Sequence, residues 1–507
     1  MLFAGAVGCG SDDSSPDPPP PPDAPKPKAL PPLTSAPLST EETLSLGHAV
    51  ADGTLDPRVP DDVTKMLGQG FGDTKAAAGL AVVDRTLDGM PAPLAGANRK
   101  LLVRFVHLAD TQLADDESPV RLANFDSPQG ATSGAYRPQE GHECRILNAA
   151  VRTINFVHES TPVDFVLLGG DNADNAQTNE VDWFRAILGG AAAVSCDSGA
   201  DNDPTPGPDN DPKDPFVAEG LAMPWRWVTG NHDVLNQGNF PVAAKMTDAV
   251  GTLAANGTRD WSQPGGPVST GDFPADAQRK PLTRDELVSR VAGDGDGHGL
   301  DAATAVPGKA YYTFDVEGTP LRFIVLDTAA ETGASDGVVH QADVDAFVKP
   351  ALDEAAQAGK LVVLTSHHAS NLLTDGSGAF GEKQPDAVMP DAWRALVGGY
   401  DNVLMHLAGH THVHRVTVAA PATGTPYFEL ETSALADWPH QMRFIEIWDE
   451  DDGWISIRAI GLDYSVEGDP VAAEGRSLGV LDVTSGWGVD GSGDPEQRNV
   501  ALWVQKP

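Results

Sequence analysis

Basic residues and long apolar runs are both scarce in this chain of 507 residues. Lys and Arg number 34 against 73 Asp and Glu, so the formal net charge is −39. A surface with this charge repels nucleic acid wherever no cation intervenes, and bulk nucleic-acid binding is not expected. No stretch approaches the roughly 20 apolar residues of a membrane-spanning helix, which argues against an integral membrane protein.

Cysteine is also rare, with three in the whole sequence, and the first of them is Cys9. Residues 1–8 are small and apolar, and the stretch AVGC that ends at Cys9 resembles the lipobox of bacterial lipoproteins, although no basic residue precedes it. Ten prolines among residues 16–32 form a stiff, polar tether. We therefore expect an exported protein of the periplasm or cell envelope, held at the membrane only by a lipid on Cys9. The alternative is an accidental cysteine in a disordered N-terminus.

The other two cysteines, Cys144 and Cys196, are left as a possible pair. An exported protein meets an oxidising compartment, in which disulfides form and persist. Both cysteines lie in or beside segments that we interpret as insertions, where a covalent link would stabilise a long loop. The sequence therefore favours a disulfide, with two buried thiols as the alternative.

Apolar runs typical of buried strands begin near residue 101. The first is LLVRFVHL at residues 101–108, and similar runs follow at residues 163–169, 225–229, 321–327, 361–366 and 403–408. Segments with helical spacing lie between them, at residues 144–158, 180–188 and 341–358. This alternation predicts an α/β sandwich. From residue 427 to residue 460, short strand-like runs separated by turns indicate a β-meander that completes a second sheet.

The length allows roughly three domains, or one large domain with tails. Active groups of α/β sheets gather beyond the carboxyl ends of strands, so we expect the function to lie in the strand-rich part. In order, the predicted parts are a truncated lipoprotein-type signal segment (1–9), a Pro-rich disordered tether (10–40), a poorly defined N-terminal extension (41–100), a domain with loop insertions (101–465) and a C-terminal extension that packs on it (466–507).

Five clusters of polar residues follow the predicted strands. They are Asp110 in LADTQL, Asp171 and Asp174 in GGDNADN, Asn231, His232 and Asp233 in GNHD, His367 and His368 in TSHHAS, and His410, His412 and His414 in AGHTHVH. Carboxylates, a carboxamide and imidazoles together suit borderline divalent metals. They are too many for one tetrahedral ion, so the pattern indicates a two-metal centre with ions about 3.5–4 Å apart. Such a centre clamps an ester oxygen and generates hydroxide.

In order and spacing, these clusters resemble the calcineurin-like metallophosphoesterases, whose pattern runs D-x-H, G-D-x-x-D, G-N-H-D/E, H, G-H-x-H. Four of the five blocks match, over about residues 100 to 460. The resemblance implies a four-layer αββα sandwich of two mixed β-sheets. It also implies a role for each matching residue: Asp110 and His412 would bind the first metal, Asp171 would bridge, Asn231, His367 and His410 would bind the second metal, and His232 would be catalytic and face the substrate.

One position departs from that pattern, because Gln112 stands where the family has the His of D-x-H. A neutral carboxamide binds metal more weakly than an imidazole does. The first site is then looser, filled by water, or suited to a harder metal such as manganese or magnesium rather than zinc. We retain Gln112 as a candidate ligand, and the two divalent ions could be Mn, Fe, Zn or Mg.

The resemblance predicts a metal-dependent phosphoester hydrolase in which metal-bound hydroxide attacks a phosphate-ester substrate. The low content of Lys and Arg slightly favours phosphodiesters over phosphomonoesters. The alternative is a catalytically degenerate module that binds partners at the cell surface, with Gln112 as the sign of decay. The intact residues of the other four blocks argue against this alternative.

Four further residues are weaker candidates. Asp174 is expected to orient a ligand or a water molecule. His368 and His414 each neighbour a candidate ligand, so we expect them to contact the ligands rather than the metals. His298, in the glycine-rich sequence GDGDGHG, could reach the pocket from a loop.

Overall fold

The computed structural model describes residues 27–128, 132–200, 202–242, 248–293, 297–301, 303–330, 332–378 and 380–507. The predicted signal segment with Cys9, and most of the predicted tether, lie outside these ranges. Among the helices within them, none combines the length and the apolar character needed to cross a bilayer.

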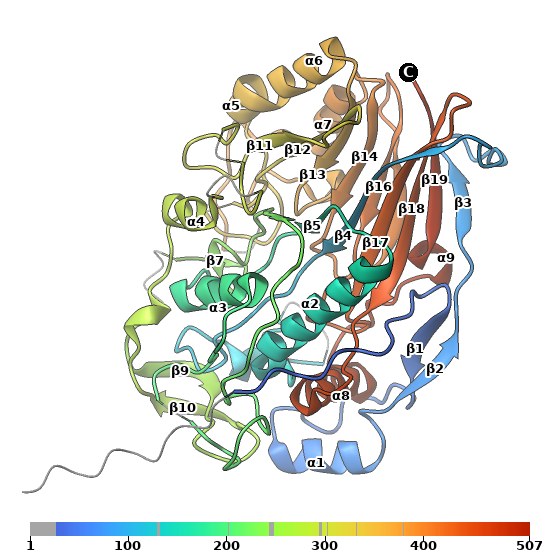
Figure 1. The fold of residues 1–507 in the computed structure, drawn as a ribbon. Helices are drawn as coiled ribbons and strands as arrows, with labels where there is room; N and C mark the ends of the chain where they lie inside the picture. The colour runs from blue at the N-terminus through green and yellow to red at the C-terminus, as the bar shows by residue number, and fades with distance from the viewer. Residues whose placement is uncertain are drawn as a thin grey trace, which may run out of the picture.

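Two mixed β-sheets form the centre of the protein (Figure 1). One has six strands, in the spatial order β11 (Tyr312–Asp315), β12 (Leu321–Val325), β13 (Leu361–Thr365), β14 (Val403–Ala408), β16 (Tyr427–Glu431) and β15 (Arg415–Ala419). The other has seven, in the order β3 (Val83–Thr86), β19 (Val500–Gln505), β18 (Trp454–Asp463), β17 (Gln441–Asp449), β4 (Lys100–Leu108), β5 (Phe165–Leu168) and β6 (Trp225–Arg226). The strands that precede the polar clusters run parallel, β4 to β5 to β6 and β13 to β14. Their carboxyl ends therefore lie at one edge of each sheet.

The two sheets pack face to face through aromatic side chains. Phe105 of β4 and Phe165 of β5 contact Phe323 of β12 edge to face, with ring centroids 5.5 and 5.4 Å apart. The next residue of β12, Ile324, packs on the opposite face among helical side chains. Because successive side chains of a strand point to opposite faces, apolar runs without alternation mark strands that are buried on both sides.

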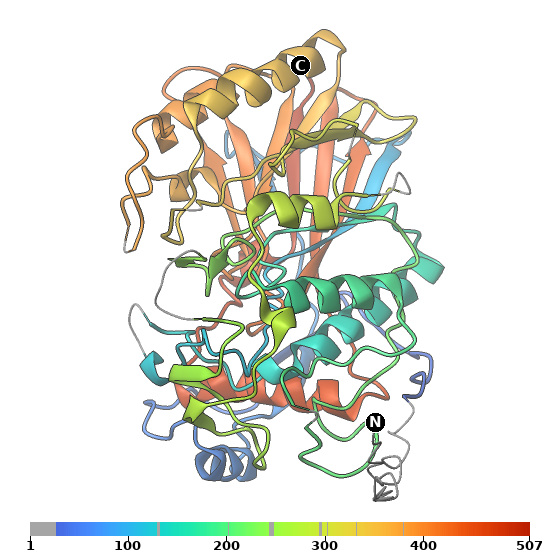
Figure 2. The same cartoon turned by 90° about the vertical axis from the view of Figure 1, so that its left-hand side faces the viewer.

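Helices cover the outer faces of the pair of sheets (Figures 1 and 2). Leu352 and Trp393 pack with Ile324 on the six-stranded sheet, and Ile146 and Phe184 belong to the core around the seven-stranded sheet. The fold is thus the predicted four-layer αββα sandwich. Its helices include α1 (Pro60–Gly68), α2 (Glu143–Ser160), α3 (Thr178–Gly189), α4 (Arg284–Val291), α5 (Gln341–Asp343), a π-helical turn (Val344–Val348), α6 (Lys349–Gln357), α7 (Pro390–Val397), α8 (Pro470–Ser485) and α9 (Pro495–Arg498).

Both outer segments of the chain contribute to the seven-stranded sheet. β19 pairs antiparallel with β18 and parallel with β3, so residues 500–505 belong to the sheet rather than to an extension packed on it. Residues 41–100, for which the sequence showed no clear pattern, contain α1 and β3. Their short polar strands give little periodic signal. The remaining short strand pairs are β1 (Glu42–Leu46) with β2 (Thr74–Ala78), β7 (Leu235–Asn236) with β8 (Phe240–Pro241), and β9 (Leu253–Arg259) with β10 (Val268–Asp272).

The predicted β-meander over residues 427–460 is wrong in its sheet assignment. β16 pairs in parallel with β14 in the six-stranded sheet, whereas β17 pairs with β18 and β4 in the other sheet. Residues 432–440 therefore form a loop that crosses from one sheet to the other, which we call the crossing loop. Alternating apolar residues predict a strand but do not identify its partner.

A disulfide joins Cys144 and Cys196, as the sequence favoured. Cys144 lies in the first turn of α2, and Cys196 lies in the segment that follows α3. Both residues are buried, and 52 positions separate them in the sequence. The bond therefore ties the start of α2 to a long insertion.

We expect the double substitution Cys144→Ser and Cys196→Ser to lower the free energy of unfolding by about 2–4 kcal/mol, because the bond constrains the unfolded chain. Urea denaturation of the oxidised parent and the double variant measures the difference. Equal midpoints, or two free thiols in protein purified without reductant, would contradict the assignment.

Candidate metal centre

Strand ends from both sheets bring the predicted motifs together. Asp110 follows β4 and Asp171 follows β5, and the two segments run side by side, with the Gln112 amide donating to the Asp171 carbonyl at 2.8 Å. His367 follows β13 and His410 follows β14 in the other sheet. Since parallel strands present their carboxyl ends at one edge, the fold gathers residues that are far apart in the sequence.

Two glycines allow the sheets to approach each other at this point. A Cβ atom on Gly170 would lie 2.6 Å from His367 Nδ1, and one on Gly409 would lie 2.5 Å from Asp110 Oδ2. Gly170 also has a φ of +88°, a conformation that residues with a side chain rarely adopt. The motifs GGD and AGH thus require glycine for space, and the first requires it for conformation as well.

The backbone is strained at five of the predicted ligands. Asp110, Gln112, Asp171, His410 and His412 all have φ values between +44° and +70°. Such conformations cost on the order of 1–3 kcal/mol each in non-glycine residues, and they cluster at functional sites. Their repetition at side chains that face one another indicates that the rest of the fold imposes this arrangement.

One half of the centre consists of Asp171, Asn231, His367 and His410. His367 Nε2 lies 3.0 Å from Asp171 Oδ2, and His410 Nδ1 lies 3.2 Å from Asn231 Oδ1 and 3.3 Å from His367 Nε2. Backbone carbonyls accept from His367 Nδ1 at 2.8 Å and from Asn231 Nδ2 at 3.0 Å. These contacts fix the side chains of His367 and Asn231. His367 Nε2 and Asn231 Oδ1 therefore both face His410 Nδ1.

The other half contains Asp110, Gln112 and His412. His412 Nε2 lies 3.3 Å from Asp110 Oδ1, which is also 3.8 Å from His367 Nε2 in the first half. Gln112 is 4% exposed, and its Oε1 atom has no hydrogen-bond partner among the described residues. A buried carbonyl oxygen without a partner is costly, and a bound cation would supply the missing contact.

These residues fit a centre for divalent metals. The ligand atoms of Asp110, Asp171 and His367 lie within 4.8 Å of one another, and so do those of His367, His368 and His410. Carboxylate oxygens and imidazole nitrogens are suitable ligands for Mn, Fe and Zn. The two groups share His367, so a bound metal would lie next to this residue.

The buried carboxylates raise the pKa values of two imidazoles that face them. Burial by itself lowers the pKa of His367, but the charges of Asp171 and Asp110 outweigh it and raise that pKa to about 9. The pKa of His412 is likewise raised to about 10 against the effect of burial, first by Asp110 and then by Asp437. The same carboxylates would attract a metal ion, which binds these imidazoles in their neutral form and displaces a proton.

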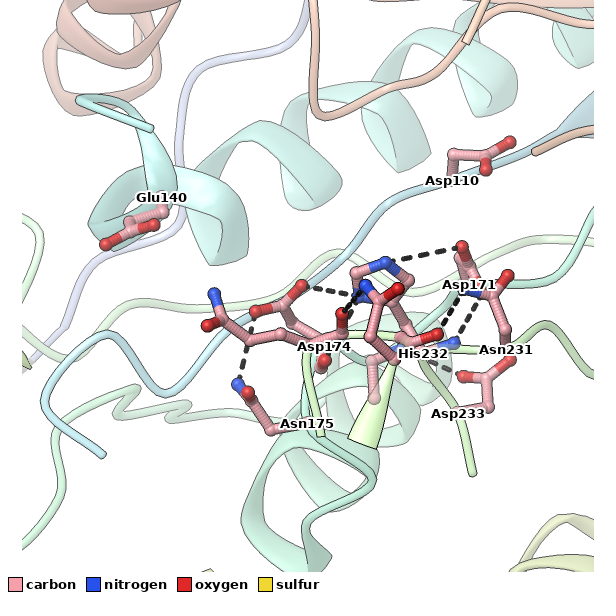
Figure 3. A network of polar contacts seen from close by, with 12 residues as sticks. Asp110, Glu140, Asp171, Asp174, Asn175, Asn231, His232 and Asp233 are labelled. Carbon is pink, nitrogen blue, oxygen red and sulfur yellow. Dashed lines mark hydrogen bonds and ion pairs between the residues drawn. The ribbon is translucent and has the colours of Figure 1, made fainter. Parts of the chain in front are cut away.

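His232 lies beside the carboxylates of Asp171 and Asp174 (Figure 3). Its Nδ1 atom is 2.8 Å from Asp174 Oδ1, its Nε2 atom is 3.9 Å from Asp171 Oδ2, and its side chain is 15% exposed. Although burial lowers the pKa of His232, Asp171 and Asp174 raise it above its usual value. Asp174, expected to orient a ligand or water, thus orients His232, and it is itself paired with the buried Arg121.

His368 and His414 are both held by hydrogen bonds to other groups. His368 Nδ1 lies 2.8 Å from Thr328 Oγ1 and Nε2 lies 2.9 Å from a backbone carbonyl, while its ring packs against that of His410 at 4.4 Å. It therefore contacts a candidate ligand, as expected. His414 Nε2 lies 3.0 Å from Ser433 Oγ, so this residue instead stabilises the crossing loop.

The expectation that His298 reaches the pocket is not met. Its ring packs against Trp225 at a centroid distance of 5.7 Å, and its Nδ1 atom is 3.4 Å from the Trp225 amide. Trp225 begins β6, whereas Asn231 and His232 follow the carboxyl end of that strand. His298 thus lies at the opposite end of the strand from the centre.

The sequence did not point to Asp437 and Arg137, which support the site from behind. Asp437 Oδ2 lies 2.5 Å from His412 Nδ1, and Arg137 Nε donates to Asp437 Oδ1 at 2.7 Å. Asp437 follows β16 in the crossing loop, and Arg137 precedes α2. The two residues are 300 positions apart in the sequence, so no local pattern predicts their contact. The one available signal for Asp437 was that polar residues follow β16, as they follow the other strands of the site.

The family model described as calcineurin-like phosphoesterase matches residues 103–414. The chain belongs to this family. That match spans every candidate ligand from Asp110 to His412, and it makes this phosphoesterase a hydrolase of phosphate esters that uses metal ions. Comparison with curated protein sequences gives no match.

Three solved structures are similar to this phosphoesterase at low sequence identity. A dimetal phosphatase from Danio rerio is 14% identical with a TM-score of 0.39, and the match covers 72% of this chain and 100% of that one. A purple acid phosphatase from yellow lupin (Lupinus luteus) is 12% identical with a TM-score of 0.31, covering 75% and 54% respectively. GAP50, the anchor in the inner membrane complex of Plasmodium, is 11% identical with a TM-score of 0.32, covering 74% and 94%.

Asp171→Asn should remove bound metal and turnover together, because a neutral carboxamide cannot bridge two cations as a carboxylate does. Metal content after reconstitution with Mn²⁺, measured by elemental analysis beside phosphate-ester turnover, checks this expectation. Asp391→Asn, a change at an exposed position on α7, is the matched control and should alter neither quantity. Two ions per chain with full turnover in the Asp171 variant would contradict a bridging role.

Proposed function

We propose that this chain hydrolyses phosphodiesters at a centre of two divalent ions between its two sheets. The observation that carries the proposal is the convergence of two buried carboxylates and three imidazoles beside the solvent-facing His232. Asp110, His412 and the Gln112 carbonyl would hold the first ion. Asp171 would bridge, and the second ion would be held by Asn231, His367 and His410.

When bound, such ions lower the pKa of water and neutralise charge on the phosphoryl oxygens. Mn, Fe, Zn and Mg all remain candidates, with the Gln112 oxygen favouring the harder ions. The side chains of the protein would orient the substrate and supply the proton to the leaving oxygen. Since Asp174 accepts a hydrogen bond from His232 Nδ1, the Nε2 atom is left to stabilise the phosphoryl group and to protonate the leaving oxygen.

The charges around the centre support a diester over a monoester. A phosphomonoester carries an additional negative charge, which a cationic side chain would have to neutralise. Arg137 is paired with Asp437, and the buried Arg121 is paired with both Asp174 and Glu140. The two arginines nearest to these groups in the described residues, Arg137 and Arg121, are thus already neutralised by carboxylates.

Turnover of bis(p-nitrophenyl) phosphate and p-nitrophenyl phosphate, after loading with each of the four metals, tests the proposal. We expect a higher kcat/KM for the diester. A higher value for the monoester would overturn the diester preference. No turnover of either ester with any metal would favour the alternative of a degenerate surface-binding module.

His232→Ala should keep its metals but lose about 10²–10⁴-fold in turnover, because it removes a general acid. The defect should be larger for an alkyl leaving group than for nitrophenolate, which leaves without a proton. His340→Ala, at an imidazole paired with Asp386 outside the centre, is the control. Equal defects with both leaving groups would exclude the general-acid role, and loss of metal would make His232 a ligand.

We further infer that the protein is exported and anchored by a lipid on Cys9. The AVGC stretch, the Pro-rich tether and the Cys144–Cys196 disulfide support this location. In protein expressed with a complete lipoprotein signal peptide, Cys9→Ser should move the protein out of the membrane fraction, since stable anchoring needs acylation. Unchanged membrane association would refute lipidation, and a cytoplasmic parent protein would refute export.

A further inference from the structure

The two imidazoles on either side of Asp110 are oriented by different groups. His367 Nδ1 lies 2.8 Å from the neutral carbonyl of Gly169. His412 Nδ1 lies 2.5 Å from a carboxylate oxygen of Asp437, which leaves Nε2 3.3 Å from Asp110. A carboxylate behind a ligating imidazole fixes its tautomer and raises its basicity as a ligand, more strongly than a carbonyl does.

Asp437 is itself held firmly. Arg137 donates to both carboxylate oxygens, from Nε at 2.7 Å and from Nη2 at 3.3 Å. The side chains of Asp437 and Arg137 are 14% and 11% exposed, so solvent screens the pair little. A planar guanidinium that binds both oxygens leaves the carboxylate little freedom to turn away from His412.

The crossing loop places Asp437 against the first half of the centre. The Leu435 amide donates to the Ala109 carbonyl and the Ala436 amide donates to the Asp110 carbonyl, both at 3.0 Å. Residues 435 and 436 thus bind the backbone at Ala109 and Asp110. The residue that follows them, Asp437, binds the ring of His412. The same loop therefore fixes two of the candidate ligands of the first site, Asp110 and His412.

We propose that Asp437, anchored by Arg137, is a positioning residue that strengthens the first metal site, where Gln112 replaces an imidazole. The inference rests on the proposed function, because it assumes that Asp110 and His412 bind metal. Asp437 orients His412 more strongly than the Gly169 carbonyl orients His367. The stronger orienting group thus lies behind the first site, whose Gln112 is the weaker ligand. A carboxylate at this position offsets part of what the carboxamide of Gln112 loses.

Asp437→Asn tests this role, because the change keeps the shape and removes the charge. Protein loaded with two Mn²⁺ ions is mixed with excess chelator, and metal release is followed with time. We expect one ion to be lost about 10–100-fold faster than from the parent, with the release of the other unchanged. Adding Gln112→His to the Asp437→Asn variant should slow the fast release.

The matched control is Asp174→Asn, which makes the same change behind His232, an imidazole outside the ligand set. It should leave both release rates as in the parent. Unchanged release from the Asp437 variant, or equal acceleration of both ions, would overturn the positioning role. If the parent binds no metal, the proposed function fails as well, so the two failures are distinguishable.

A measurement on the parent alone covers the case in which the variant does not fold. In the zinc-loaded protein with ¹⁵N-labelled histidine, His412 should show a protonated Nδ1 coupled to its hydrogen, with Nε2 bound to metal. A signal from an unprotonated Nδ1 would overturn the inference, because Asp437 would then receive no hydrogen bond from His412.

Discussion

The convergence of Asp110 and Asp171 is the constraint on which the rest of the site depends. These carboxylates lie at the ends of neighbouring strands and are almost completely buried. Negative charges in such a position must be compensated by cations or by hydrogen-bond donors. The imidazoles of His367 and His412 lie against these carboxylates, and divalent ions bound at the same point would compensate their charge. The strained backbone at five ligand positions is consistent with a geometry that the surrounding structure enforces.

Two segments far apart in the chain support this geometry from behind. The crossing loop holds Asp110 through its backbone and His412 through Asp437. The segment before α2 supplies Arg137, which binds Asp437, and Glu140, which is paired with Arg121 behind Asp174. The disulfide at Cys144 follows directly, so the covalent link stabilises the region that supports both His412 and His232.

Much of the site could be predicted from the sequence, because each cluster directly follows a strand with a clear apolar run. Buried strands, glycines and polar residues at strand ends are local signals, and they pointed to Asp110, Asp171, His367 and His410, which the fold brings together. Features that depend on long-range pairing could not be predicted. The partner of β16, the place of β19 beside β3, and the contact between Arg137 and Asp437 join residues with no periodic relation. The glycine-rich sequence around His298 suggested a loop that reaches the pocket. His298 instead packs against Trp225 at the start of β6, at the opposite end of the strand from the centre.

The most direct test of the two-metal account is anomalous diffraction from crystals loaded with Mn²⁺. The account predicts two peaks about 3.5–4 Å apart. One should lie beside Asp110 and His412 and the other beside Asn231 and His410, with Asp171 between them. A single peak, or peaks away from these residues, would contradict the account.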